Sequence, residues 1–227
     1  MGPHLWVTEI FHSIQGESSY MGWPCVFVRL TGCNLRCVYC DTTYAFTEGR
    51  KMSVDEVVQC VQAMWEGAQA VQSARAGFPL VEITGGEPLL QKGVHGLAER
   101  LCDLGFTVLI ETGGQLPIWT LDPRVIRIMD IKTPGSGHEH ANLWENIEHL
   151  RPQDEVKFVL MDRRDFEWAV QVIQRYDLPR RAHVLLSPVY GVLDPKALAE
   201  WIVQSRLPVR MQIQLHKVIW GPEARGV

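Results

Sequence analysis

Three cysteines, Cys33, Cys37 and Cys40, stand in the pattern C-x-x-x-C-x-x-C directly after the apolar run 26–30. Thiolates are soft ligands that select zinc or iron–sulfur clusters, and a cluster of four irons takes one protein ligand on each iron. Three cysteines leave one iron open to a substrate or cofactor, so the pattern favours a cluster that takes part in chemistry. The alternatives are unrelated buried cysteines and a zinc site completed by His12, although no second Cys or His pair at zinc-finger spacing follows.

Composition narrows the class of protein. The chain has 227 residues, a length typical of one domain, and its 46% hydrophobic and 21% charged residues are ordinary for a globular protein. A formal net charge of −4 and scattered tryptophans give no reason to expect nucleic acid as a partner. No apolar run approaches the roughly 20 residues that cross a bilayer, and no signal-peptide pattern opens the chain. We therefore expect a cytoplasmic protein that acts on a small molecule and contacts no membrane.

Apolar runs typical of buried strands alternate with helical patterns along the chain. The predicted strands are 26–30, 80–83, 107–110, 125–131, 155–160, 182–186 and 209–215. Ser53 followed by Glu56 is a capping box that opens a helix through about Val71. Apolar periodicity predicts further helices over 93–104, 162–176 and 195–205.

This alternation predicts a parallel sheet whose outer face is covered by helices. Seven strands are too few for a closed eightfold barrel. We therefore expect one domain over residues 1–227, an incomplete, TIM-like (β/α) barrel with irregular N-terminal and C-terminal extensions. Reactive groups in such barrels gather at the carboxyl ends of the strands, which is where the cysteine triad stands.

Two motifs together resemble the radical S-adenosylmethionine (SAM) superfamily: the cysteine triad within 32–42, and Thr-Gly-Gly-Glu-Pro at 84–88 after the next predicted strand. The second motif alone would be an ordinary turn, but the pair is specific. The resemblance implies a 4Fe–4S cluster whose open iron chelates SAM, and an electron from the cluster that cleaves SAM to a 5′-deoxyadenosyl radical. The two glycines would let the backbone approach a ligand closely, because they lack Cβ.

Further segments resemble the 7-carboxy-7-deazaguanine synthase family within that superfamily. They are FHSIQGE at 11–17, FVRL at 27–30, DIKTPGSG at 130–137, LSPVYG at 186–191 and QIQLHK at 212–217, so the resemblance spans essentially the whole chain. One departure is Ser18, where the family commonly has glycine. The implied reaction is a ring contraction of 6-carboxy-5,6,7,8-tetrahydropterin to 7-carboxy-7-deazaguanine with loss of ammonia, as in queuosine biosynthesis, and SAM is regenerated.

The resemblance also implies the site residues. The triad holds the cluster, and Thr42 holds Mg²⁺ together with the substrate carboxylate, a suitable set of oxygen ligands; from the sequence alone Thr42 could equally be a helix or turn cap. The implied SAM contacts are Tyr39, Cys40, Asp41, Gly85, Gly86, Glu87, Lys132, Ser136, Ser187, Pro188, Val189 and Tyr190. The implied substrate contacts are Ile14, Gln15, Gly16, Glu17, Arg29, Thr84 and His216. No catalytic residue beyond the SAM radical is expected.

Two of these substrate contacts have alternative interpretations. Arg29 ends an apolar strand, where a planar cation needs an anionic partner, and we assign it to the substrate carboxylate; the alternative is an arginine that faces solvent. His216 follows the long predicted strand 209–215, where an isolated histidine is often structural.

Other functions share part of the pattern. A glycyl-radical-enzyme activase has the triad and the Gly-Gly-Glu-Pro turn, but the segments 11–17 and 212–217 argue against it. A noncatalytic iron–sulfur carrier or a zinc scaffold has no use for that turn, and intact ligands argue against a degenerate member. The family resemblance further implies an external electron donor of flavodoxin or ferredoxin type. It also implies a homodimer, since the open edge of an incomplete barrel needs covering.

Overall fold

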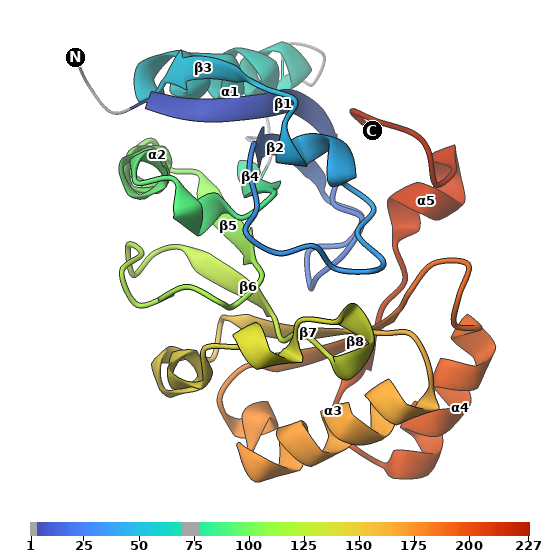
Figure 1. The fold of residues 1–227 in the computed structure, drawn as a ribbon. Coiled ribbons are helices and arrows are strands. Elements are labelled where there is room, and N and C mark those ends of the chain that lie inside the picture. Colours follow the sequence, from blue (N-terminus) through green and yellow to red (C-terminus); the bar gives the residue numbers. More distant parts are fainter. Residues whose placement is uncertain (1–3, 70–77) are drawn as a thin grey trace.

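The computed structural model describes residues 4–69 and 78–227, which form one mixed sheet of nine strands (Figure 1). The strands are β1 (His4–Ile14), β2 (Pro24–Leu30), β3 (Arg50–Ser53), β4 (Leu80–Gly85), β5 (Thr107–Thr112), β6 (Ile126–Asp130), β7 (Glu155–Leu160), β8 (His183–Pro188) and β9 (Arg210–Met211). Their order across the sheet is β3-β1-β2-β4-β5-β6-β7-β8-β9. β1 is antiparallel to both its neighbours, and the strands from β2 to β9 are all parallel. Because β3 and β9 are the two edges, the barrel is open.

The predicted incomplete (β/α) barrel is confirmed, and all seven predicted strands are present. The last is wrong in length, because β9 has two residues in place of the predicted run 209–215. β1 and β3 are additions that the sequence analysis does not predict. β1 includes polar residues such as Glu9 and His12, so it lacks the continuous apolar run by which buried parallel strands are recognised.

Five α-helices accompany the described sheet: α1 (Val54–Gln69), α2 (Gly93–Asp103), α3 (Arg163–Arg175), α4 (Pro195–Ser205) and α5 (Leu215–Trp220). The 3₁₀ turns are η1 (Thr43–Phe46), η2 (Pro88–Leu90), η3 (Pro134–Ser136), η4 (Glu139–Ala141), η5 (Trp144–His149) and η6 (Leu178–Arg180). The first four helices match the predicted ones, although the end predicted at Val71 lies outside the described residues. None of the helices in residues 4–69 and 78–227 is long and apolar enough to cross a bilayer.

The capping box predicted from Ser53 and Glu56 forms at the start of α1. The Glu56 amide donates to Ser53 Oγ over 3.2 Å, and the Ser53 amide donates to Glu56 Oε2 over 2.6 Å. Two of the orphan amides at the helix start are thereby satisfied. The box sets the helix start directly after β3, so that α1 lies along the sheet beside β1 and β2 (Figure 1).

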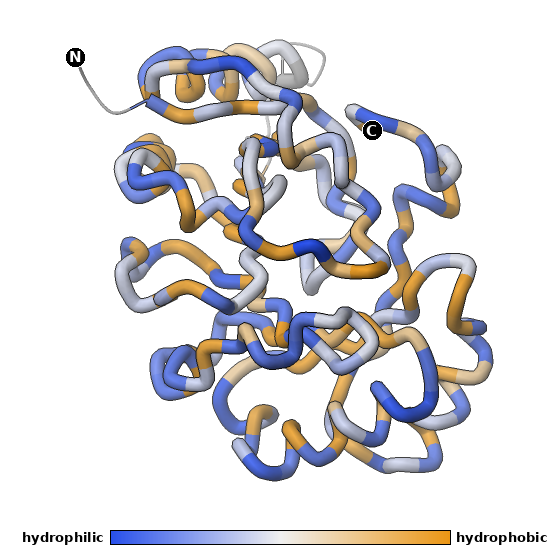
Figure 2. Tube along the Cα trace, in the orientation of Figure 1, coloured by the Kyte–Doolittle hydropathy of each residue, from blue (hydrophilic) through white to orange (hydrophobic). Residues whose placement is uncertain are grey.

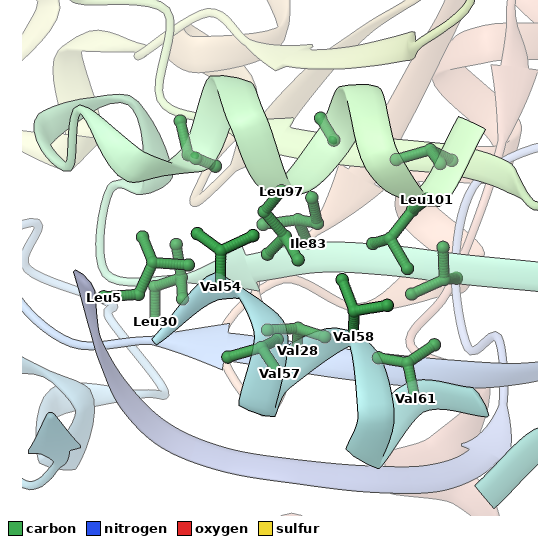
Figure 3. Close-up of a cluster of buried hydrophobic side chains, with 14 of the residues drawn as sticks. Leu5, Val28, Leu30, Val54, Val57, Val58, Val61, Ile83, Leu97 and Leu101 are labelled. Carbon is green, nitrogen blue, oxygen red and sulfur yellow. The ribbon is translucent and has the colours of Figure 1, made fainter. Parts of the chain in front are cut away.

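Helices α1 and α2 cover one half of the sheet with apolar side chains. Figure 3 shows Val57 and Val61 of α1 and Leu97 of α2 close to Val28 of β2 and Ile83 of β4; all five are fully buried. Each such side chain contributes about 1.5–3 kcal/mol by leaving water. A second cluster packs β7 and β8 against α3 and α4, whose hydrophobic and hydrophilic residues alternate along the chain in Figure 2. The two clusters hold the parallel strands side by side and set the positions of their carboxyl ends.

Candidate active site

A cleft of about 770 Å³ opens at the carboxyl ends of the parallel strands. The loop of residues 31–42 after β2, here called the cysteine loop, forms one wall of it and lies across the open barrel in Figure 1. Predicted site residues that line the cleft are Ile14, Gln15, Gly16, Glu17, Arg29, Cys33, Cys37, Tyr39, Cys40, Asp41, Thr42, Thr84, Gly85, Gly86, Glu87, Lys132, Ser187, Val189, Tyr190 and His216. Segments from both ends of the chain thus meet at one site.

Ser136 and Pro188 are predicted SAM contacts that do not line the cleft. Ser136 is fully buried, and its hydroxyl donates to the Thr133 carbonyl over 2.6 Å and accepts from the His138 amide over 3.0 Å. Its carbonyl accepts from the Val38 amide over 3.2 Å. Ser136 therefore supports the cysteine loop from behind.

Cys33, Cys37 and Cys40 are free, half-buried thiols on the cleft wall. Burial raises the pKa of both Cys33 and Cys37. The other cysteines lie on β2, α1 and α2 and do not line the cleft. Three thiols without a fourth are the donor set that a 4Fe–4S cluster with one open iron requires. Among residues 4–69 and 78–227, no three His, Cys, Asp or Glu side chains are placed to hold a single metal ion.

The glycines of the Gly-Gly-Glu-Pro turn pack directly on the cysteine loop. Gly85 has φ +126°, and a Cβ on it would clash with the Leu30 backbone; a Cβ on Gly86 would clash with the Gly32 carbonyl. The Gly86 amide donates to the Leu30 carbonyl over 3.0 Å, and the Glu87 amide donates to the Gly32 carbonyl over 2.7 Å. The need for glycine here therefore comes from the approach of two protein segments, whereas the sequence analysis attributes it to a ligand.

Replacing Gly86 with Ala is expected to displace the cysteine loop. The added methyl group meets rigid backbone, an overpacking that costs about 1–3 kcal/mol of unfolding free energy. Iron and sulfide content after anaerobic reconstitution should fall well below the wild-type value. The matched control is Gly96→Ala on α2, where a Cβ meets nothing within 4 Å. Wild-type iron content in the Gly86→Ala protein would contradict this packing argument.

The Glu87 carboxylate links the same turn to the end of β5. It accepts from the Leu89 amide over 3.0 Å, from Thr112 Oγ1 over 2.8 Å and from the Gly113 amide over 2.8 Å. Burial raises the pKa of Glu87, and these three bonds partly oppose that effect. The carboxylate therefore fixes the turn relative to β5 while it lines the cleft.

Arg29 reaches the cleft from β2 and pairs with a residue of β1. Its Nε lies 2.8 Å from Glu9 Oε1, and the same oxygen accepts from the Tyr44 hydroxyl over 2.8 Å. The Arg29 side chain is 16% exposed, so the alternative of a solvent-facing arginine is wrong. Burial raises the pKa of Tyr44 to about 12, which keeps its hydroxyl a donor to Glu9. The guanidinium is thus held with its remaining edge available to the cleft.

His216 lies on α5 and touches the turn that follows β1, so the prediction that it ends a long strand is wrong. The Leu215 amide donates to the Gly16 carbonyl over 2.9 Å, and a Cβ on Gly16 would clash with His216 Nδ1. Burial lowers the pKa of His216, which favours the neutral imidazole. The chain turns away from the sheet at Gln214, whose side-chain Nε2 donates to Glu17 Oε1 over 2.9 Å.

Ser18 adopts the left-handed backbone conformation, with φ +63°. Glycine reaches this region without strain, which is a physical reason for the glycine that the family resemblance leads us to expect here. Here the Ser18 amide donates to Gln212 Oε1 over 2.8 Å, and its hydroxyl accepts from the Tyr20 amide over 3.1 Å. These bonds hold the serine in the conformation that the turn requires.

Three charged residues that the sequence analysis does not predict line the floor of the cleft: Glu82 of β4, Glu111 of β5 and Lys157 of β7. Lys157 Nζ lies 3.0 Å from Glu17 Oε2 and also pairs with Glu111. Burial alone would lower the pKa of Lys157, but the two carboxylates raise it well above its usual value. Charged residues are rarely buried without a partner. Their presence inside strands that are predicted to be buried was the sequence signal that could have identified these three site residues.

Two further ion pairs line the walls. Lys132 Nζ lies 2.8 Å from Asp130 Oδ2, and Lys217 pairs with Asp41 while its ammonium stands 5.6 Å from the Tyr190 ring centre. Asp130 and Lys217 are also absent from the predicted set. Thr42 takes the N-cap position of η1, yet its side chain makes no capping hydrogen bond, so the alternative of a side-chain cap is wrong there. Thr42 lines the cleft, and its Oγ1 lies 3.8 Å from Cys40 Sγ.

Comparisons with known proteins show which families this chain resembles. The Radical SAM superfamily model matches residues 27–130. The chain is 47% identical over 224 residues to a 7-carboxy-7-deazaguanine synthase of Chlorobaculum tepidum, covering 97% of this chain and 96% of that protein. It is 43% identical over 235 residues to one from Koribacter versatilis, covering 97% and 99%.

A solved structure is similar in fold. The crystal structure of QueE from Escherichia coli matches with a TM-score of 0.73 and 23% identity, covering 94% of this chain and 95% of that one. That likeness concerns the fold, which is the open barrel described above. The identities over nearly the full length of the named synthases carry the assignment. The chain therefore belongs to the 7-carboxy-7-deazaguanine synthase family of radical SAM enzymes.

Proposed function

We propose that this protein converts 6-carboxy-5,6,7,8-tetrahydropterin to 7-carboxy-7-deazaguanine and ammonia, as a lyase of 7-deazapurine and queuosine biosynthesis. The observation that carries the proposal is one cleft whose lining includes three free thiols together with Arg29, Glu17 and Thr84. One wall suits a cluster with an open iron, and the other residues suit a planar, polar acid. Residues suited to the cluster and residues suited to the substrate therefore line the same cleft of about 770 Å³.

The family implies a 4Fe–4S cluster and SAM as cofactors, and the residues present fit them. When bound, they supply a radical that abstracts hydrogen from C6 of the pterin and later returns it. Cys33, Cys37 and Cys40 would hold the cluster. The proposed SAM contacts are the predicted ones that line the cleft, including Gly86 and the Tyr39 backbone. Thr42, whose hydroxyl caps nothing in η1, would hold Mg²⁺ together with the substrate carboxylate.

The remaining groups would bind and orient the pterin. The Arg29 guanidinium would take the carboxylate, because Glu9 already fixes the plane of the guanidinium through Nε. The backbone of Ile14 and Gly16 and the Glu17 carboxylate would read the donors and acceptors of the pyrimidine ring. His216, in contact with this turn, would close that side of the cleft. These groups are positioned by burial and hydrogen bonds before any ligand arrives, which lowers the cost of ordering on binding.

The test is an anaerobic assay of the iron-reconstituted protein with dithionite, SAM, Mg²⁺ and the carboxytetrahydropterin. We expect the product mass to appear, to vanish in Cys37→Ala and to fall when Mg²⁺ is chelated. Cys60→Ala, which removes a thiol of α1 outside the cleft, is a matched control expected to retain the product. SAM cleavage with untouched pterin would contradict the substrate assignment of Arg29 and His216. Activation of a glycyl-radical protein, or a colourless protein after reconstitution, would favour the activase or the zinc scaffold.

Two partners belong to the same proposal. An external donor of flavodoxin or ferredoxin type would supply the electron that dithionite replaces in the assay. The protein would act as a homodimer, in which the second copy covers an open edge of the sheet at β3 or β9. Sedimentation of the reconstituted protein measures this oligomeric state, and a monomer would contradict it.

A further inference from the structure

The floor of the cleft holds more carboxyl groups than neighbouring cations. Glu82, Glu111 and Glu17 gather around one ammonium group, that of Lys157. Glu82 and Lys157 are each 5% exposed, so water offers little screening. Three ionised carboxylates beside one cation would leave two uncompensated charges in a poorly solvated place, which is costly. One of the three carboxyl groups should therefore carry a proton.

Hydrogen bonding identifies Glu82 as that group. Glu111 is paired with Lys157 and accepts from Thr84 Oγ1 over 3.0 Å, and Glu17 is 3.0 Å from the same lysine. Among the described residues Glu82 forms no ion pair, and its Oε2 accepts from the side-chain Nε2 of Gln15. Its other oxygen makes no hydrogen bond with the described part of the chain, and Glu82 lines the cleft.

Electrostatics agree with this assignment. Burial raises the pKa of Glu82 well above its ordinary value, and the charge of Glu111 raises it further. The charged groups that face Glu82 are Glu111 from β5, Lys157 from β7 and Glu17 from the turn after β1. On β2, Cys25 also faces it, and burial keeps that thiol neutral by raising its pKa. The charge of Lys157 acts to lower the pKa of Glu82, but Lys157 is already paired with two carboxylates.

We propose that Glu82 is the catalytic acid that protonates the departing amine, an inference that rests on the proposed function. The C–N bond breaks, its electron pair stays with nitrogen, and that nitrogen takes the Glu82 proton. Substrate and product differ by one molecule of ammonia, so no external oxidant or reductant is needed. A ring position that becomes aromatic then releases a proton, which the Glu82 carboxylate takes back. Lys157 is a positioning residue that pairs with Glu111 and Glu17.

The test separates hydrogen transfer from ammonia release in the holoenzyme. Substrate deuterated at C6 reports the first step through label that appears in SAM, and ammonia is measured directly. In Glu82→Gln we expect label transfer within about twofold of wild type and ammonia release slower by about 100-fold or more, the usual contribution of a general acid. Wild-type ammonia release should fall as the pH rises through the Glu82 pKa, because the protonated form is required, and the variant should lose this dependence.

Controls exclude a merely structural effect. Glu155→Gln replaces a carboxyl group that is also buried and has a pKa raised by burial, but lies outside the cleft. This variant should release ammonia at the wild-type rate. Glu82→Asp, which keeps an acid, should retain more ammonia release than Glu82→Gln and provides the test if the glutamine variant does not fold. Wild-type ammonia release in Glu82→Gln, or equal loss of both steps, would overturn the assignment. Absence of both steps in the wild-type protein would instead contradict the proposed function.

Discussion

Replacing Lys157 with Met is expected to lower the free energy of unfolding by about 3–5 kcal/mol, the range measured when one partner of a buried ion pair is removed. The side chain is 6% exposed and lies between Glu17 and Glu111, which would lose their shared cation. Met keeps most of the volume of the lysine stem, so the loss of stability would come from the removed charge and not from a cavity. Urea unfolding of the full-length protein measures the effect.

The pH dependence of this loss has a definite sign. Burial acts to raise the pKa of Glu111, and Lys157 more than offsets it, so the pKa of Glu111 lies below its ordinary value. Without Lys157, burial would dominate and the pKa would rise above its unfolded value. The deficit in stability should therefore grow as the pH rises through the new Glu111 pKa.

A compensating variant and a control make the prediction specific. Glu111→Gln combined with Lys157→Met should recover part of the loss, since one of the unpaired charges is removed. Lys196→Met, at an exposed position that opens α4, should change stability little. Equal effects of the two lysine replacements would show that the buried pairs do not stabilise the fold.

Replacing Asp154 with Ala is expected to cost a similar 3–5 kcal/mol by the same mechanism. Asp154 is fully buried just before β7, where it accepts from Arg127 Nε and from the Arg127 backbone amide, each over 3.0 Å. It also accepts from the Arg151 amide over 2.8 Å. Its removal would leave the Arg127 guanidinium buried without a counter-charge, and urea unfolding again measures the cost.

The stabilisation by Asp154 depends on pH because its carboxyl group must be ionised. Burial raises the pKa of this carboxyl group, but the hydrogen bonds from Arg127 and Arg151 outweigh it and hold the pKa below the ordinary value. The stabilisation is present above the unfolded pKa of about 4 and is lost as the pH falls through the lower folded value. The alanine variant should lack this acid-dependent loss. Glu167→Ala, which breaks the exposed pair with Arg163, is the control and should change little.

The sequence predicts the parallel part of the fold well because the strands from β4 to β8, and β2, are buried on both faces. Such strands appear as continuous apolar runs, and the helices between them begin at clear signals such as Ser53 with Glu56. β1 is missed because it lacks a continuous apolar run and carries Glu9, a charged residue that pairs with Arg29. β9 is too long in the prediction because the glutamines at 212 and 214 bond to Glu17 and draw the chain out of the sheet.

The site is predicted only as far as its motifs extend. The cysteines, the Gly-Gly-Glu-Pro turn and the Gln-Gly-Glu turn occupy contiguous positions with recognisable spacing, and the structure brings them to one cleft. Glu82, Glu111 and Lys157 are isolated charges on three different strands. Their common purpose depends on which strands are neighbours and which face is inward, and a linear pattern does not contain that information. An inward-facing charge within a predicted buried strand is the signal to follow in such barrels.

The meeting of the two chain ends has a consequence for how the protein matures. Glu17 bonds to Gln212, 195 positions later, and the Gly16 carbonyl receives the Leu215 amide. A chain that emerges from the ribosome can form its first strands early, but the turn after β1 lacks its partners from residues 212–217 until the last segment is released. Contacts of such long sequence separation form late in folding. The barrel can therefore assemble before the cleft exists, and the capacity to bind a ligand should be the last property that the newly made protein acquires.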